Sequence, residues 1–196
     1  APYVSWISIS LDCSTSESNE AMTGKGGALQ FRKILEFLQY NASLDKKTAK
    51  IKLATVITKR NKDDLLALGK LILEDQSGYK PDIWRLYQFS DQFSDETDVG
   101  YQYVTENSVS AEEAEAVIRT LRERFPGQNI SYRPAESRDQ SFIFISPDLT
   151  LTYPSGKKYV AFGNTGKMTA DQIRVAITGV RDIVWGKIIT NRAIYS

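Results

Sequence analysis

The 196-residue chain contains no histidine and a single cysteine, Cys13. Without histidine it cannot supply a histidine-based catalytic triad, and a lone thiol cannot complete a structural zinc site or an iron–sulfur cluster. One cysteine also excludes an internal disulfide, which fits a reducing compartment, so we expect a cytoplasmic protein. Carboxylates that could bind magnesium are present, but no sequence pattern arranges them as a site.

Long apolar runs and an excess of charge of either sign are also missing. The apolar stretches are shorter than the roughly twenty residues that cross a membrane. Lys and Arg number 25 against 24 Asp and Glu, and the net charge of +1 gives no footprint for a nucleic acid. Neither the dinucleotide glycine fingerprint nor the Walker motif occurs. We therefore expect an ordinary globular protein that binds neither membranes nor nucleic acids.

Residues 4–27 begin as a strand, continue as a polar loop with three glycines and lead into an amphipathic helix. In the strand, apolar and polar residues alternate, the two sets being Ile7, Ile9 and Leu11, and Ser8, Ser10 and Asp12. Strand, loop and helix are the first half of a βαβ unit, in which the carboxyl end of the strand faces the ligand. The polar set would then face a barrel interior or a crevice. An ordinary solvent-exposed face is the alternative.

Two further strands are predicted, at residues 51–58 (IKLATVIT) and 83–89 (IWRLYQF). The segment between them has leucine and isoleucine at helical spacing, and Asn61 is placed to cap this helix. Each connection is long enough to cross over the sheet. The sequence therefore predicts an α/β fold in which three strands are parallel neighbours.

The pattern changes after residue 90. Residues 101–104 are a candidate short strand, and Ser110 with Glu113 forms a capping box that opens an amphipathic helix. Short strands separated by tight turns follow over residues 130–162, and Thr169 with Gln172 caps a last helix that extends to Val184. We divide the chain into residues 1–90, the parallel α/β part, and residues 91–196, a C-terminal α+β extension.

Three segments in fixed order resemble the fourth, fifth and sixth strands of radical S-adenosylmethionine enzymes: residues 8–12 (SISLD), 52–61 (KLATVITKRN) and 84–89 (WRLYQF). A later Glu136-Ser137 pair before Phe142-Ile-Phe144 is similar to the viperin-like branch of that family. The resemblance implies half of a partial TIM-like barrel, built from three parallel strands with crossover helices. It also implies an enzyme that uses S-adenosylmethionine and a [4Fe–4S] cluster.

The chain lacks several features of the family pattern, and these absences limit what the resemblance implies for this chain. The Cys-x-x-x-Cys-x-x-Cys loop that holds the cluster, the first three strands and the glycine-glycine-glutamate motif are absent, and Ala54 and Thr58 replace frequent asparagines. We therefore expect the C-terminal portion of a longer enzyme whose partner is the missing N-terminal half of the barrel. This chain alone should bind no cluster or cosubstrate and show no activity.

The resemblance also suggests binding residues. The side chains expected to contact the cosubstrate are Ser8, Ser10, Asp12, Thr58 and Gln88. Those expected to contact a small-molecule substrate are Lys52, Glu136 and Arg138. Lys52 either meets an anion in the barrel or extends from its end, and the last two residues could instead lie on a solvated loop. No catalytic residue or metal ligand is assigned, and Cys13 is expected to be a small structural side chain.

Strand alternation places Gln88 and Arg85 on opposite faces, and we favour Gln88 for the interior because the family pattern keeps glutamine there. The alternatives to a radical enzyme are a non-catalytic α/β module that binds a nucleotide-like ligand or a protein partner, and a structural half that pairs with another subunit. In a half-barrel the strand at residues 4–11 has an open edge, which predicts a homodimer through that edge. The meander at residues 130–162 is expected to cover the opposite edge.

Overall fold

The computed structural model of the chain describes residues 4–45, 49–74, 79–89, 101–138, 142–155 and 158–180. The chain divides into two compact units. The first comprises residues 1–89 and 105–133, and the second comprises residues 90–104 and 134–196.

The first unit is built on a four-stranded, fully parallel sheet in the order β1-β2-β3-β4. Its strands are β1 (Trp6–Ser10), β2 (Lys50–Ile57), β3 (Ile83–Gln88) and β4 (Ile130–Arg133). The prediction that the first three strands are parallel neighbours is confirmed. The fold class is therefore α/β, and β1 is an edge strand of this sheet.

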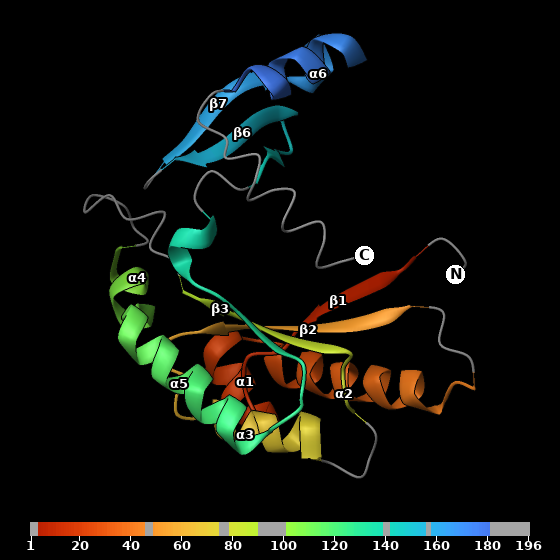
Figure 1. Cartoon of the computed structure of the whole chain (residues 1–196), viewed down its shortest axis with the longest axis vertical. Coiled ribbons are helices and arrows are strands. Elements are labelled where there is room, and N and C mark those ends of the chain that lie inside the picture. Colours follow the sequence, from red (N-terminus) through yellow and green to blue (C-terminus); the bar gives the residue numbers. More distant parts are fainter. Residues whose placement is uncertain are drawn as a thin grey trace. The chain divides into compact units, whose positions relative to one another are not determined.

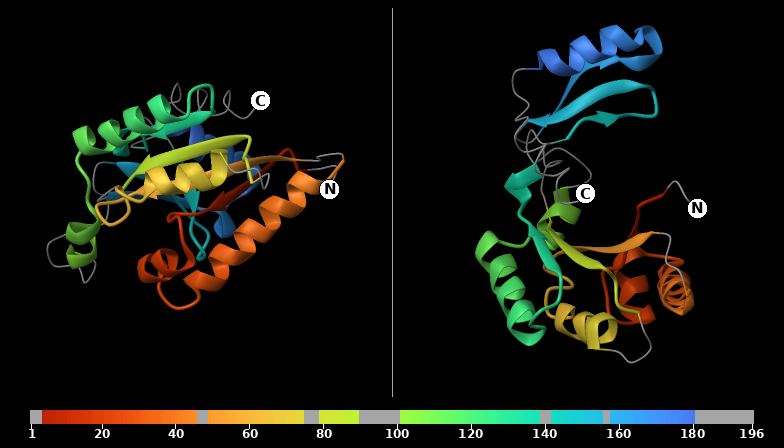
Figure 2. Two further views of the ribbon diagram at one scale, coloured as in Figure 1. Left: turned by 90° about the horizontal axis from the view of Figure 1, so that it is seen from below. Right: turned by 45° about the vertical axis from the view of Figure 1, so that its right-hand side comes forward.

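Helices α1, α2, α3 and α5 lie together on one face of the sheet (Figures 1 and 2). Their bounds, with the π-helical turn η1 that extends α3, are α1 (Ser16–Thr23), α2 (Gly27–Ser43), α3 (Leu65–Gly69), η1 (Lys70–Glu74) and α5 (Ala111–Arg124). Their apolar side chains form one core with the sheet, whose fully buried members include Leu53, Leu68, Trp84 and Leu121. This core fixes which side of each strand is covered.

The period-two pattern of β2 separates the two faces of the sheet. Ile51, Leu53, Thr55 and Ile57 are buried toward the helices, whereas Lys52 and its alternate neighbours are half-buried or exposed on the other side. Thr55 also links β2 to the residue that follows β1, because its hydroxyl donates to Leu11 O at 2.6 Å. A polar residue is therefore tolerated at a fully buried position.

Residues 130–133 differ from the prediction. They were expected to open the C-terminal meander, but they form β4, which pairs in parallel with β3. Helix α5 provides the crossover between these strands, so residues 105–133 belong to the first unit rather than to the extension. The outer edge of β3 is covered by residues 130–133, which lie in the segment expected to cover it. They pair as a parallel strand and not as part of an antiparallel meander.

Two local predictions also change. Residues 101–104 were expected to be a strand but begin helix α4 (Tyr101–Asn107). Val104 and Asn107 are buried and three residues apart, whereas Tyr103 between them is 54% exposed, which is helical spacing. The polar loop after β1 contains α1, whose N-cap Thr15 forms a capping box with Ser18.

The second unit contains a three-stranded antiparallel sheet in the order β5-β6-β7, together with helical turns and α6. Its elements are η2 (Ala135–Arg138), β5 (Phe144–Ile145), β6 (Thr150–Ser155), β7 (Lys158–Asn164), η3 (Thr165–Lys167) and α6 (Ala170–Gly179). The meander and the Thr169–Gln172 capping box are confirmed. The end of the predicted last helix, at Val184, lies outside the described residues.

No helix in the described part of the chain is both long enough and apolar enough to cross a membrane.

Candidate functional site

The register of the parallel sheet brings polar and basic side chains together on the face opposite the helices. Ser8 pairs with Lys52, and two residues further along Ser10, Ala54 and Arg85 stand in one row. The row ends at Ser131 of β4. We call this side of the sheet the cationic face, which carries Ser8, Ser10, Lys52, Arg85, Ser131 and Arg133.

The same register corrects the choice between Gln88 and Arg85. Gln88 pairs with Ile57 and is buried on the helix-covered face, where its amide donates to Val109 O at 3.1 Å and its Oε1 accepts from Tyr132 Oη at 3.2 Å. Arg85 lies on the cationic face, and its Nε donates to Ser131 Oγ at 3.0 Å. Gln88 is therefore a core residue, and the residue that shares a face with Ser8 and Lys52 is Arg85.

The three basic residues of this face follow a diagonal across the sheet. Arg85 pairs with Ala54, two residues beyond Lys52, and Arg133 pairs with Tyr87, two residues beyond Arg85. With strands about 4.8 Å apart and a rise of about 3.3 Å per residue, each step between basic Cα atoms is about 8 Å. Long basic side chains can converge over such distances, so a small anion could contact two of them.

Arg133 provides a separate indication of a ligand. Its Nη2 is buried and has no hydrogen-bond partner within the described part of the chain. A buried guanidinium nitrogen without a partner loses its hydration and gains nothing in exchange, which costs free energy. An anion that accepts from this group would remove that cost.

The carboxyl ends of β1 and β2 are joined by a compact hydrogen-bond network around Asn61. The Asn61 amide nitrogen donates to Asp12 O at 2.8 Å and to Val56 O at 2.9 Å. Its Oδ1 accepts from Thr58 N at 2.8 Å and from Thr58 Oγ1 at 3.1 Å. Asn61 is 1% exposed, and its side chain therefore fixes where the two strands end.

This network corrects the prediction that Asn61 caps the following helix. The N-cap of α3 is Asp64, whose side chain makes no capping bond. The Asp64 carboxylate instead accepts from Ser14 N at 2.6 Å and from the Ser14 hydroxyl. The local sequence is compatible with Asn61 as a helix cap and with Asn61 as a link between strand ends. The carbonyl groups of Asp12 and Val56, which accept from its amide, favour the link.

Asp12 and Thr58, both expected to contact the cosubstrate, are instead bound within the protein. Asp12 Oδ1 accepts from Val56 N at 2.7 Å and so continues the ladder between β1 and β2. Burial raises the pKa of Asp12, and the Val56 hydrogen bond opposes this rise. Thr58 is 2% exposed and bound to Asn61. Of the five residues proposed for the cosubstrate, Ser8 and Ser10 are the two exposed on the cationic face.

Cys13 lies beside this network as a buried side chain. Burial, and after it the negative charge of Asp64, raises the pKa of the thiol to about 11. Its sulfur contacts Met22 Sδ at 3.7 Å. A buried thiol with a raised pKa is a poor nucleophile and a poor metal ligand, which agrees with the structural role expected for it.

The remaining predicted residues belong to the second unit. Glu136 is exposed in η2, and the side chain of Arg138 lies outside the described residues. Contact of these two residues with a substrate stays a prediction.

The chain does not provide the ligands for an iron–sulfur cluster. Such a cluster is held by about four ligands, mostly cysteine thiolates, whereas the sequence has one cysteine and it is buried. Among the described residues, no group of three His, Cys, Asp or Glu side chains could hold a metal ion. A cluster would have to be bound by another polypeptide segment.

Sequence reasoning missed Ser131 and Arg133. Both lie in a four-residue strand whose place in the sheet depends on pairing with β3, 46 residues away for the Arg85–Ser131 contact. The available signal was the amphipathic helix at residues 111–124 before an extended segment, the same pattern that identified the earlier βαβ units.

Comparison with protein-family models and with curated proteins finds no match to this chain.

Proposed function

We propose that the chain is the C-terminal portion of the catalytic domain of a radical S-adenosylmethionine enzyme, in which the cationic face forms part of the wall that binds a small anionic substrate. Among its residues, Ser8 and Ser10 would contact the cosubstrate, and Lys52, Arg85 and Arg133 would contact the substrate. The single observation that carries the proposal is the convergence of these polar and basic side chains on the face that is opposite the helices.

The arrangement of helices favours a barrel over an open doubly wound sheet. In a doubly wound fold helices cover both faces, whereas in a TIM-like barrel they form only the outer layer. Helices α1, α2, α3 and α5 all lie on one face of the sheet (Figure 2). A barrel made with further parallel strands would enclose the cationic face as its interior.

The chemistry of this face favours an anion with oxygen acceptors. Arginine guanidinium groups bind carboxylates and phosphates through paired, charge-assisted hydrogen bonds. Arg85 is held by Ser131, and Arg133 has a buried nitrogen without a partner among the described residues. These groups would position the substrate by charge, while the serine hydroxyls bind neutral polar atoms.

The radical chemistry itself would come from groups that this chain does not hold, because its residues do not fit a cluster. The contribution of the chain is to bind and orient ligands and to exclude water from one side of the barrel. The missing N-terminal half of the barrel is the partner that this function requires.

A non-catalytic α/β module that binds a nucleotide-like ligand is the second candidate, because the same basic residues would bind phosphate groups. The cationic face would bind an anion in both the radical enzyme and the binding module. The two candidates differ in the segment encoded upstream. A Cys-x-x-x-Cys-x-x-Cys motif in that reading frame would support the radical enzyme, and its absence would favour the binding module.

The anion site is tested by titrating the chain with pyrophosphate in a calorimeter. We expect binding that weakens with added salt. An Arg133→Gln variant should bind about 10- to 100-fold more weakly, since a hydrogen bond to a charged group contributes about 1.5–3 kcal/mol. The matched control is Arg119→Gln, which makes the same change of charge at an exposed position of α5.

Two results would contradict the proposal. One is the absence of pyrophosphate binding to the folded wild-type chain at low ionic strength. The other is an equal loss of affinity in the Arg133→Gln and Arg119→Gln variants, which would indicate attraction by overall charge rather than a site.

A further inference from the structure

The outer edge of β1 presents main-chain hydrogen-bonding groups that the sheet does not use. The bonds from Lys50 N to Ser5 O and from Leu11 N to Ala54 O show that odd-numbered residues of this segment face β2. In a parallel ladder the main-chain groups of alternate residues point to opposite sides. The N–H and C=O groups of Ser8 and Ser10 therefore point to the open edge, which no strand among the described residues pairs.

A groove of about 470 Å³ runs beside this edge, between β1 and α2. Its lining from α2 consists of Gln30, Lys33, Ile34 and Phe37, and that from β1 of residues 7–10. Ile7 and Ile9 are half-buried on this side, so the groove is apolar where it meets the core. An open edge beside an apolar groove is suited to a strand that places apolar side chains toward α2.

We propose that this edge binds a second copy of the chain, with the two β1 strands paired in antiparallel fashion about a twofold axis at Ser8. In this register Ser8 faces Ser8 of the second copy, and Ile7 faces Ile9. The proposal goes beyond the proposed function and requires no ligand on the cationic face. It concerns the chain without the missing N-terminal half of the barrel, which under the proposed function would pair with this same edge of β1.

Strand β1 is complementary to a second copy of itself in this register. In an antiparallel pair, two opposite residues whose main-chain groups face each other exchange both hydrogen bonds, and Ser8 meets this condition at the axis. Ile7 and Ile9 then form apolar cross-strand pairs on the helix side of the sheet, beside the groove. A twofold interface of this kind closes after two copies and leaves no new edge.

Charge does not oppose the pairing. Lys52 pairs with Ser8 on the inner side of β1, so the two Lys52 residues of a dimer are three strand spacings apart, about 14 Å. This exceeds the screening length of about 8 Å at physiological ionic strength. The cationic faces of the two copies would therefore continue side by side without strong repulsion.

Light scattering coupled to size-exclusion chromatography tests the dimer, which should have twice the 22.1 kDa mass of one chain. Ser8→Pro removes the outward N–H and should give a monomer, while the odd-numbered residues keep their bonds to β2. Ser8→Ala is the matched control. It leaves the main chain unchanged and should remain dimeric.

A cysteine cross-link tests the register without depending on the proline variant. Opposite Cα atoms of a hydrogen-bonded antiparallel pair are about 5.5 Å apart, within the range of a disulfide, so Ser8→Cys should form a covalent dimer on mild oxidation. In the same register the two residues at position 5 are about 20 Å apart, and Ser5→Cys should not cross-link.

A monomeric wild-type chain over an about 100-fold range of concentration would overturn the proposal. So would a dimer that survives Ser8→Pro, or one in which Ser5→Cys cross-links as fast as Ser8→Cys. These outcomes leave pyrophosphate binding, and with it the proposed function, unaffected, so the two proposals fail separately.

Discussion

Replacing Asn61 with alanine should loosen the carboxyl ends of β1 and β2. The Asn61 side chain makes four hydrogen bonds, two as donor to Asp12 O and Val56 O and two as acceptor from Thr58. Alanine cannot make any of them. Because the site is buried, water cannot replace the lost partners without opening the strand ends.

The size of the effect follows from these four bonds. Each contributes about 0.5–1.5 kcal/mol net, and each leaves a buried group unsatisfied when it is lost. We expect Asn61→Ala to lower the free energy of unfolding by roughly 3–5 kcal/mol, a large part of the 5–15 kcal/mol typical of a domain. Asn61→Asp should be no milder, because a carboxylate would face two carbonyl oxygens where the amide donated.

Urea denaturation followed by circular dichroism and by tryptophan fluorescence measures this change. Trp84 is a suitable reporter, since it is fully buried in the core of the same unit and its Nε1 donates to Thr55 at 2.9 Å. The matched control is Asn129→Ala, which removes one exposed hydrogen bond, from Asn129 to Asp82 O at 3.0 Å. The control should cost about 1 kcal/mol or less.

If Asn61→Ala destabilises the protein no more than Asn129→Ala does, the strand-end network is not formed in solution. The assignment of Asp12 and Thr58 as structural residues would then have to be withdrawn, and both would again be candidates for ligand contact.

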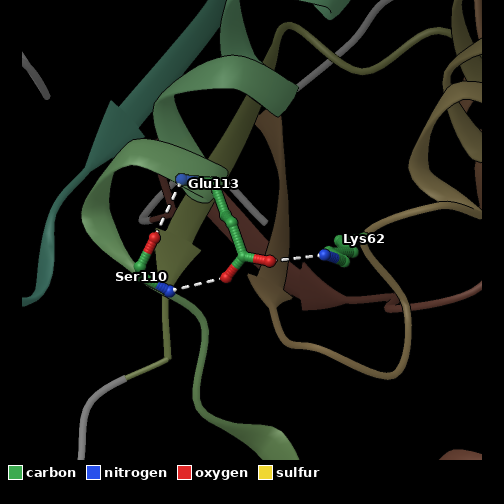
Figure 3. A network of polar contacts seen from close by, with 3 residues as sticks. All are labelled: Lys62, Ser110 and Glu113. Carbon is green, nitrogen blue, oxygen red and sulfur yellow. Dashed lines mark hydrogen bonds and ion pairs between the residues drawn. The ribbon is translucent and has the colours of Figure 1, made fainter.

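Three further predictions concern the Cys13 thiol and the N-terminus of α5. At pH 8 the Cys13 thiol, with its pKa of about 11, should react with a disulfide reagent roughly 100-fold more slowly in the native than in the unfolded chain, and a difference below tenfold would refute the burial. Ser110→Ala removes the N-cap of α5 and should destabilise the protein by about 1 kcal/mol in urea denaturation, whereas an unchanged midpoint would refute the capping box (Figure 3). The hydrogen bond from the Lys62 side chain, and after it the one from the Ser110 main chain, lowers the pKa of Glu113. The stabilisation that these two bonds give is therefore complete above the ordinary glutamate pKa of 4.5, and it is lost as the pH falls through the lower pKa of Glu113 in the folded chain. The difference in urea midpoint between the wild type and Lys62→Met should shrink below pH 4.5, and a constant difference would contradict the ion pair.

Features specified by neighbouring residues could be predicted from the sequence. The three strands β1, β2 and β3 follow from apolar patterning, and their parallel order follows from the helical connections. The capping boxes at Ser110 and Thr169 follow from residues three positions apart. Helix α1 was missed because Asn19 is its only buried residue, so it lacks the apolar stripe by which such helices are recognised.

Features that depend on distant pairing could not be predicted in the same way. Alternation separates Arg85 from Gln88, but which of them shares a face with Ser8 depends on the register of β3, and a shift by one residue reverses the answer. The role of Asn61 likewise depends on the carbonyl groups of Asp12 and Val56. These long-range choices decide the candidate site, so it was only partly predictable although the fold class was.

The most direct test of the proposed function is to locate bound pyrophosphate on the isotopically labelled chain by nuclear magnetic resonance. We predict that titration shifts the amide signals around Lys52, Arg85, Ser131 and Arg133, the central and outer parts of the cationic face, and leaves those of the exposed α5 residue Arg119 unchanged. Shifts confined to other surfaces, or spread evenly over the exposed lysines and arginines, would contradict an anion site on this face.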